Sequence, residues 1–139
     1  RMNTEERITR LEESNQELRE EVKNLVFQIS LLGAPTSVNR MLYEYDLNEQ
    51  DYHKILDLMD EIRNELCSHR EYTFAMYEKR MHEIFSGRHR LENDYHFFEA
   101  VARAFFEDRS YQEVFATLYG NMSKYESLME DARNTGLYQ

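Results

Sequence analysis

Apolar residues recur at alternating intervals of three and four along the first third of the chain, which is the spacing of a coiled-coil helix. With Ile8 taken as position a of a heptad, the a and d positions stay apolar over four heptads without a skip, apart from one asparagine. These positions, called the seam from here on, are Ile8, Leu11, Asn15, Leu18, Val22, Leu25, Ile29 and Leu32. The pattern predicts a coiled-coil oligomerisation helix over residues 3–33. Asn3 is its expected N-cap, and Gly33 followed by Pro35 marks its expected end.

The residue types in the seam favour a parallel homodimer. β-Branched residues at a with Leu at d are typical of two-stranded parallel coils, and a lone Asn15 at position a specifies the register. Arg7 at position g would face Glu12 at position e of the partner helix. Glu21, by contrast, would face the apolar Val26, which weakens the case for a dimer. Val26 and Phe27 widen the apolar stripe near the helix end, so this end is expected to pack on the following domain or to recruit a third helix, which keeps a trimer open. The alternative is one amphipathic helix folded back onto its own chain.

The rest of the sequence, residues 36–133, has helical spacing almost throughout and predicts one small bundle domain. Expected helix starts are Thr36 or Ser37, Asn48, Thr73, Asn93 and Ser110. The helix after Asn93 carries the most hydrophobic stripe and is the expected centre of the core. The last helix opens on a Ser-x-x-Glu capping box at Ser110 and is expected to continue past Gly120 with a bend there. Residues 134–139 form the expected frayed tail.

Composition supports an all-α fold, because four glycines and one proline provide little material for hairpins. Ten tyrosines and eight phenylalanines supply an aromatic core. The single Cys67, next to Leu66, is expected to be a packed core thiol. Because no apolar run reaches the length of a membrane span or a signal peptide, we expect a cytoplasmic protein without membrane contact. Arg1 before Met2 is interpreted as an expression remnant, with Met2 as the natural start.

A formal net charge of −10 argues against general binding to nucleic acid, whose phosphates would repel the protein. The segment from Arg80 to Arg90 is a local exception, with three arginines and two histidines, but Glu83 and Glu92 dilute its charge. We expect it to be an ordinary helix end and loop. Nucleic-acid binding through this segment is kept as an alternative hypothesis.

The sequence carries no constellation of residues that predicts catalysis, so we expect no catalytic residues, no metal site and no cofactor. The five histidines are spread over separate predicted segments. His82-Glu83 begins like a zinc-protease motif, but position 86 is Ser86 rather than the second histidine. Glu-x-x-His spacing and glycine-rich phosphate loops are both absent from the sequence. A metal-dependent or enzymatic site assembled between helices, for instance at His69, is a second alternative.

Tyrosines outnumber what a small core needs, and such residues are favoured where a surface is buried against a partner. Most of them are expected to be half-buried instead, with the hydroxyl group in water, and the others could line an interface. Carboxylates are dense around two of these tyrosines and along the helix that follows. The candidate partner surface, called the acidic surface from here on, is Tyr43, Tyr45, Asp46, Glu49, Asp57, Asp60 and Glu61.

The order of these elements resembles the YhaI-like family, a group of small helical proteins of unknown function from Bacillus-type bacteria and their relatives. The matching segments over residues 7–120 are 7–12, Tyr45 to Asp51, Tyr72 to Phe74, Phe85, and Arg109 to Tyr111. The resemblance implies a helical protein that self-associates through its first helix, and it implies no activity and no functional residues. A longer heptad stretch and an extension past about Lys124 depart from the family.

These observations lead to the hypothesis of a non-enzymatic, homo-oligomeric protein-binding module, most simply a dimer. A small regulator that captures a host or repressor protein, of the kind encoded by phages or mobile elements, is the analogy that fits. If the partner is a DNA-binding protein, the carboxylates of the acidic surface would compete for its basic residues, and binding would weaken as salt is added.

Overall fold

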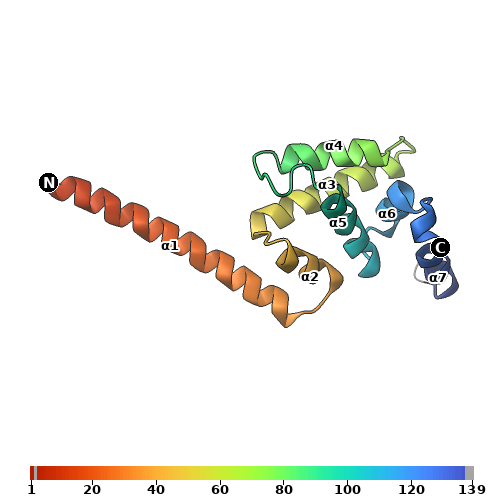
Figure 1. Cartoon of the computed structure of the whole chain (residues 1–139), viewed down its shortest axis with the longest axis horizontal. Coiled ribbons are helices and arrows are strands. Elements are labelled where there is room, and N and C mark those ends of the chain that lie inside the picture. Colours follow the sequence, from red (N-terminus) through yellow and green to blue (C-terminus); the bar gives the residue numbers. More distant parts are fainter. Residues whose placement is uncertain (2, 137–139) are drawn as a thin grey trace.

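The computed structural model describes residues 1 and 3–136, and within these residues the chain is all-α (Figure 1). The elements are α1 (Thr4–Gly33), α2 (Ser37–Glu44), α3 (Glu49–Cys67), α4 (Phe74–Ile84), α5 (Tyr95–Glu107), α6 (Gln112–Tyr119), the 3-10 helix η1 (Ser123–Tyr125) and α7 (Glu126–Asn134). The predicted all-α class is confirmed. Helices α2 to α7 pack into one body, and α1 projects from it like a stalk with the N-terminus at its far end.

The long helix α1 begins and ends where the sequence predicts. The Asn3 side chain accepts a hydrogen bond from the backbone N–H of Glu6, at 2.8 Å, and so satisfies one of the free donors of the first turn. At the other end Ala34 is extended and the following proline has no N–H to continue the helix. At 1.5 Å per residue the 30 residues of α1 extend about 45 Å.

Local side-chain caps also fix the starts of α2, α3 and α4. Thr36 accepts from the N–H of Asn39, and Thr73 accepts in the same way at α4. At α3 the cap is reciprocal: Asn48 accepts from the N–H of Asp51 at 2.8 Å, and the Asp51 carboxylate accepts from the N–H of Asn48 at 3.0 Å. Each cap stabilises its helix start by about 1 kcal/mol.

Helix α5 is the centre of the core, as its hydrophobic stripe predicts. Its Phe97 ring lies 4.7 Å from the ring of Tyr45 in the turn after α2 and 5.0 Å from the ring of Phe85 after α4. One residue before the C-terminus of α5, the Phe106 ring lies 5.1 Å from the ring of Phe115 in α6. The most extensive helix contacts of the domain accordingly join α5 to α6 and to α2. The cap of α5 is Asp94 rather than the predicted Asn93.

The C-terminal region corrects the prediction of one long last helix. The chain instead forms α6, a turn, η1 and α7, with the break at Gly120, where a side chain would collide with the carbonyl oxygen of Ala116. The predicted capping box at Ser110 does not form, because Tyr111 precedes α6 in a left-handed conformation with φ of 49° and no side-chain cap. Helix α7 ends at Asn134, and residues 137–139 of the predicted frayed tail lie outside the described residues.

A second correction concerns Cys67, which is exposed and not packed in the core. It is the last residue of α3, directly before the 68–73 loop. Its neighbour Leu66 is half-buried against the core, so one residue of this pair faces the protein and the other faces water.

Tyr77 joins α4 to the central helix. Its side chain is fully buried, and its hydroxyl donates a 2.6 Å hydrogen bond to the backbone carbonyl oxygen of Phe98. A buried carbonyl that loses a hydrogen-bond donor cannot find water as a replacement.

We therefore expect Tyr77→Phe to lower the free energy of unfolding by about 1 kcal/mol, measured by urea denaturation followed by circular dichroism. Tyr43→Phe is the matched control, because Tyr43 is 48% exposed and loses only a hydroxyl in contact with water. The control should remain within about 0.5 kcal/mol of the parent protein. Equal losses in both variants would contradict the role assigned to the buried hydroxyl.

Candidate functional site

All eight seam residues of α1 are exposed. The seven apolar ones are between 50% and 68% exposed, and Asn15 lies among them on the same face. Within the described part of α1 only Leu31 is buried, at 5% exposure. The helix carries a continuous apolar strip over four heptads that its own chain does not cover.

The domain contacts a different face of α1, close to its C-terminus. Leu31 enters the core, the Phe27 ring packs 6.4 Å from the ring of Tyr52 in α3, and Gln28 donates a 2.7 Å hydrogen bond to the carboxylate of Asp46. These α1 residues occupy heptad positions c, f and g. With about 100° per residue, the centre of this docking face lies about 140° around the helix from the middle of the seam.

The apolar widening at the end of α1 therefore has two different roles. Phe27 packs against the domain, as the sequence suggested for this end of the helix. Val26, one residue earlier, is 61% exposed and borders the seam at position e. The exposed apolar face of α1 is therefore widest beside Val26.

The residues of the acidic surface lie on α2, on α3 and in the turn between them, and several have partners within the chain. Tyr45 packs on Phe97, and Asp46 accepts the hydrogen bond of Gln28. Asp60 accepts a 2.5 Å hydrogen bond from the hydroxyl of Tyr111. The members whose side chains remain exposed without such an internal bond are Tyr43, Glu49 and Asp57, and Glu49 lies 4.0 Å from His53 on the same helix.

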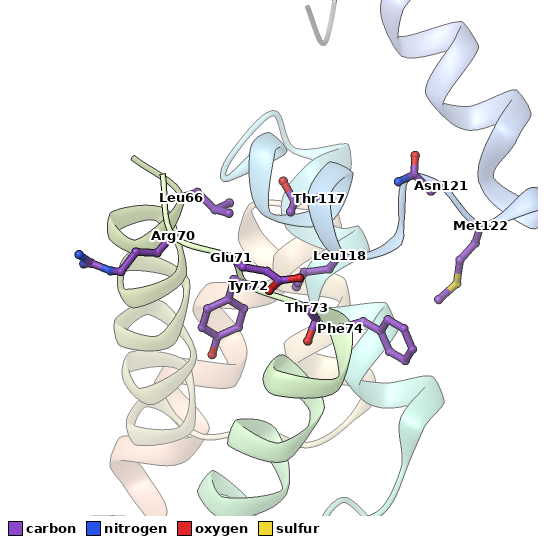
Figure 2. A pocket seen from close by; sticks show the side chains of 10 residues that line it. All are labelled: Leu66, Arg70, Glu71, Tyr72, Thr73, Phe74, Thr117, Leu118, Asn121 and Met122. Atoms are coloured by element: carbon purple, nitrogen blue, oxygen red, sulfur yellow. The ribbon is translucent and has the colours of Figure 1, made fainter. Parts of the chain in front are cut away.

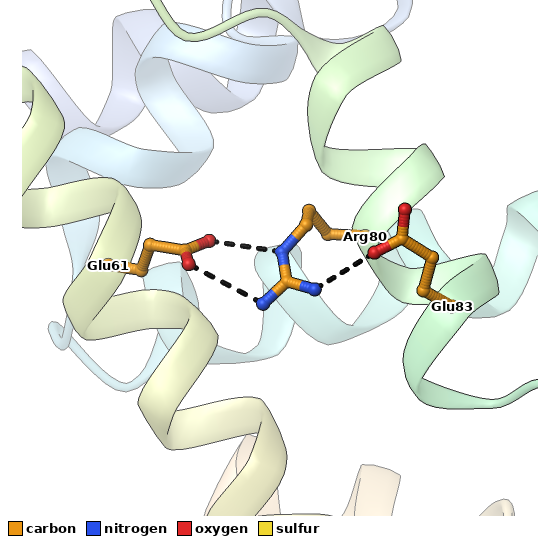
Figure 3. Close-up of polar contacts among 3 residues, drawn as sticks. All are labelled: Glu61, Arg80 and Glu83. Atoms are coloured by element: carbon orange, nitrogen blue, oxygen red, sulfur yellow. Dashed lines mark hydrogen bonds and ion pairs between the residues drawn. The ribbon is translucent and has the colours of Figure 1, made fainter.

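The seventh member of the acidic surface, Glu61, binds Arg80 across the gap between α3 and α4 (Figure 3). The Arg80 guanidinium donates to both carboxylate oxygens of Glu61, at 3.2 and 3.4 Å, and to Glu83 at 3.0 Å. These hydrogen bonds, that to Glu61 first, raise the pKa of Arg80. Glu61 thus ties two helices together.

The Arg80 to Arg90 segment is the end of α4 and the loop that follows, as expected. Two of its three arginines are paired with carboxylates, since Arg88 contacts both oxygens of Asp51 at 3.1 Å. Asp51 is 5% exposed and is also the residue that caps α3. The loop is therefore a structural clamp over the start of α3 and does not present three free cations to a phosphate backbone.

A hollow of about 590 Å³ lies between the 70–73 loop, the start of α4 and the end of α6, and sequence reasoning did not locate it. Figure 2 shows the side chains that line it, among them Tyr72, Phe74, Leu118 and Met122. The hollow is wide open to solvent and mostly apolar. Nε of Arg70, at the rim of the hollow, donates a 2.5 Å hydrogen bond to the carboxylate of Glu65. The sequence places Phe74 on the apolar face of its helix and gives no sign that the side chain is 46% exposed beside a hollow.

The histidines form no metal site in the described residues, where no three His, Cys, Asp or Glu side chains converge. Two histidines instead lie beside Glu92: Nδ1 of His82, in the last turn of α4, is 2.7 Å from its carbonyl oxygen, and His89 in the loop is 3.6 Å from its carboxylate. The same carboxylate accepts from the N–H of Gly87, and this hydrogen bond is the largest reason that the pKa of Glu92 is lowered. These contacts hold the loop between α4 and α5 together.

One carboxyl group with a raised pKa lies beside aromatic rings. Burial raises the pKa of Glu78, and Tyr119 donates to it at 3.2 Å. The ring of Tyr119 in turn lies edge-on to Tyr77, at 6.1 Å between centroids. The charge of Glu99 also raises the pKa of Glu78, and Glu99 itself binds Lys124 at 2.8 Å. The contacts around Glu78 are thus packing, one hydrogen bond from Tyr119 and the charge of a neighbouring acid that is itself paired.

Comparisons of the chain with protein-family models, with curated proteins and with solved structures find no match. Of the described helices, none combines the length and the apolar character that crossing a membrane requires. The functional argument rests on the exposed seam and on the charges described above.

Buried tyrosines give the protein a defined response to alkaline pH. Burial, as the largest cause, raises the pKa of Tyr72 and of Tyr125 from 10.0 to about 12. Below pH 10 these groups are protonated in both the folded and the unfolded chain. Between pH 10 and 12 the unfolded chain loses the protons while the folded chain keeps them, so the free energy of unfolding should fall over this interval.

We expect urea denaturation at pH 8, 10 and 11 to show this fall. Tyr72→Phe, which keeps the buried ring and removes one titrating hydroxyl, should lose less stability between pH 8 and 11 than the parent. Tyr43→Phe serves as the control, because its side chain is exposed. An unfolding free energy that stays constant up to pH 11 would refute the assignment.

Proposed function

We propose that the protein is a non-enzymatic, self-associating binding module, in which α1 pairs with another copy of the chain and the helical domains present their surfaces to a protein partner. The observation that supports this proposal is the exposed seam. Seven large aliphatic side chains and one asparagine repeat in heptads on a face that the domain leaves uncovered.

The free-energy argument favours a partner for this face. An isolated helix has little stability in water, and most helical stability in proteins comes from packing an apolar face against another element. Moving one fully exposed leucine or isoleucine into a core contributes about 1.5–3 kcal/mol. Each chain has seven aliphatic seam residues between 50% and 68% exposed, so each can contribute a part of this free energy when a partner covers it. Contiguous apolar strips of this length mark interaction sites on protein surfaces.

The chemistry of the domain supports a protein partner over a nucleic acid. A net charge of −10 repels phosphate, and the arginines at positions 80 and 88 are neutralised by carboxylates of the same chain. Tyr43, Glu49 and Asp57 are the exposed members of the acidic surface, and they suit a partner with basic residues. Binding through them would weaken as salt screens the charges.

Kinship with the YhaI-like family is part of the same proposal. It depends on short segments such as Tyr45 to Asp51, and it agrees with self-association through the first helix. The role of a small regulator that captures another protein is likewise proposed by analogy.

Self-association can be tested by placing charges in the seam. Leu18→Lys with Leu25→Lys should convert the oligomer into monomers, measured as molar mass by light scattering during size-exclusion chromatography, because lysines buried in a coil lose their hydration. The matched control is Thr9→Lys with Gln16→Lys, which adds the same two charges on the outer face of the same helix.

The control variant should retain the mass of the parent protein. A parent that already has the mass of one chain at micromolar concentration would contradict the proposal. So would an oligomer that both double variants leave intact, since its contacts would then lie outside the seam.

A further inference from the structure

We infer that two copies of the chain pair their α1 helices in parallel and in register, which carries both helical domains at the same end of the coil, on its outer sides. This inference rests on the proposed self-association and specifies its geometry. The seam fixes the direction of pairing, and the docking face of α1 fixes where the domains lie.

Asn15 distinguishes the two directions of pairing. In an antiparallel coil, a positions pack against d positions of the partner, and every d residue of this seam is leucine. An antiparallel register that pairs Asn15 with a d residue of the seam therefore buries its amide against a leucine, without a hydrogen-bond partner. In a parallel coil, a packs against a, and only the unshifted register brings the two Asn15 amides together, where each can satisfy the other.

The charges beside the seam favour the same direction. In the parallel pair, Arg7 at g faces Glu12 at e of the other helix, and the two-fold symmetry of the dimer forms this contact twice. In the antiparallel pair that keeps all eight layers, position e of one helix faces position e of the other, and the two Arg19 side chains meet near the middle. The parallel pair gains attraction where the antiparallel pair gains repulsion.

The domain leaves room for the parallel pair along the whole seam. Ile29 and Leu32, the seam residues closest to the domain, are 68% and 62% exposed, as open as those in the middle of the stalk. The domain packs on Phe27 and Leu31 from the opposite side of α1. Two helices can therefore meet down to Leu32 with one domain on each outer side of the coil, at the end opposite the free N-terminus in Figure 1.

Such a dimer is bivalent, and both of its domains point outward from one end. A partner that carries its recognition site twice, as a two-fold symmetric protein does, can engage both domains at once. The second contact is then intramolecular and the overall affinity exceeds that of one domain by an avidity factor. An antiparallel pair would separate the two domains by the length of the stalk.

The direction and register can be tested with a cysteine at the far end of the seam. Thr4 is exposed and occupies position d one heptad before Leu11. In a Cys67→Ser background, Thr4→Cys should place two thiols side by side in a parallel, unshifted dimer. Incubation in a glutathione redox buffer should then yield chains linked by a disulfide, separated by non-reducing gel electrophoresis. The matched control is Glu6→Cys on the outer face of the same turn.

We expect about ten-fold more linked chains for Thr4→Cys than for Glu6→Cys, because pairing raises the effective concentration of thiols only in the seam. Molar mass measured on the same reduced samples separates the two proposals. The mass of one chain would refute self-association itself. The mass of two chains with equal linking of both variants, or with no linking of Thr4→Cys, would overturn the parallel pairing while self-association stands.

Discussion

Helix α1 carries two apolar faces, and its own chain can cover only one of them. Leu31 is buried in the core and the half-buried Phe27 packs against it, which anchors the last two turns to the domain. The seam lies too far around the helix for the same domain to reach it, so its leucines and isoleucines remain in water in the single chain. A stalk of this length gains little from its intrinsic helix propensity alone, and its stability depends on what covers the seam. The fold and the proposed assembly are linked through this one helix.

The elements that could be predicted from the sequence are those set by neighbours along the chain. The stop of α1, the caps at Thr36 and Thr73 and the reciprocal cap between Asn48 and Asp51 all lie within three or four residues of the groups they satisfy. At Gly120 the sequence predicted a bend, whereas the helix ends there. The close approach of position 120 to the carbonyl oxygen of Ala116 is a feature of the folded backbone and is not visible in the spacing of residues. The failed capping box has a tertiary origin as well, since the Tyr111 ring packs edge-on against Phe105 at 5.5 Å and its hydroxyl reaches Asp60.

The candidate site divides in the same way. Heptad spacing located the seam, because residues that repeat at this spacing lie on one face of a helix. It could not separate free carboxylates from engaged ones on the acidic surface, since Asp46, Asp60 and Glu61 bind residues 18 or more positions away. The same limit applies to the Arg88 clamp on Asp51, 37 residues distant, and to the hollow beside Phe74, which exists only where three separate segments meet. Charge counted along a chain overstates the charge that a partner can meet.

The position of the docking face has a consequence for binding strength. Phe27, Gln28 and Leu31 are interleaved with the seam residues Leu25, Ile29 and Leu32, so the domain is fixed to the coil within the paired helix and not through a linker beyond it. Pairing of the seam would therefore set the orientation of each domain relative to its copy. A rigid bivalent arrangement loses less conformational entropy on binding a partner with matching spacing than two domains on flexible tethers would, and it gains nothing from a partner with the wrong spacing. Specificity in such a module would come from the geometry of the dimer as much as from the residues of either domain surface.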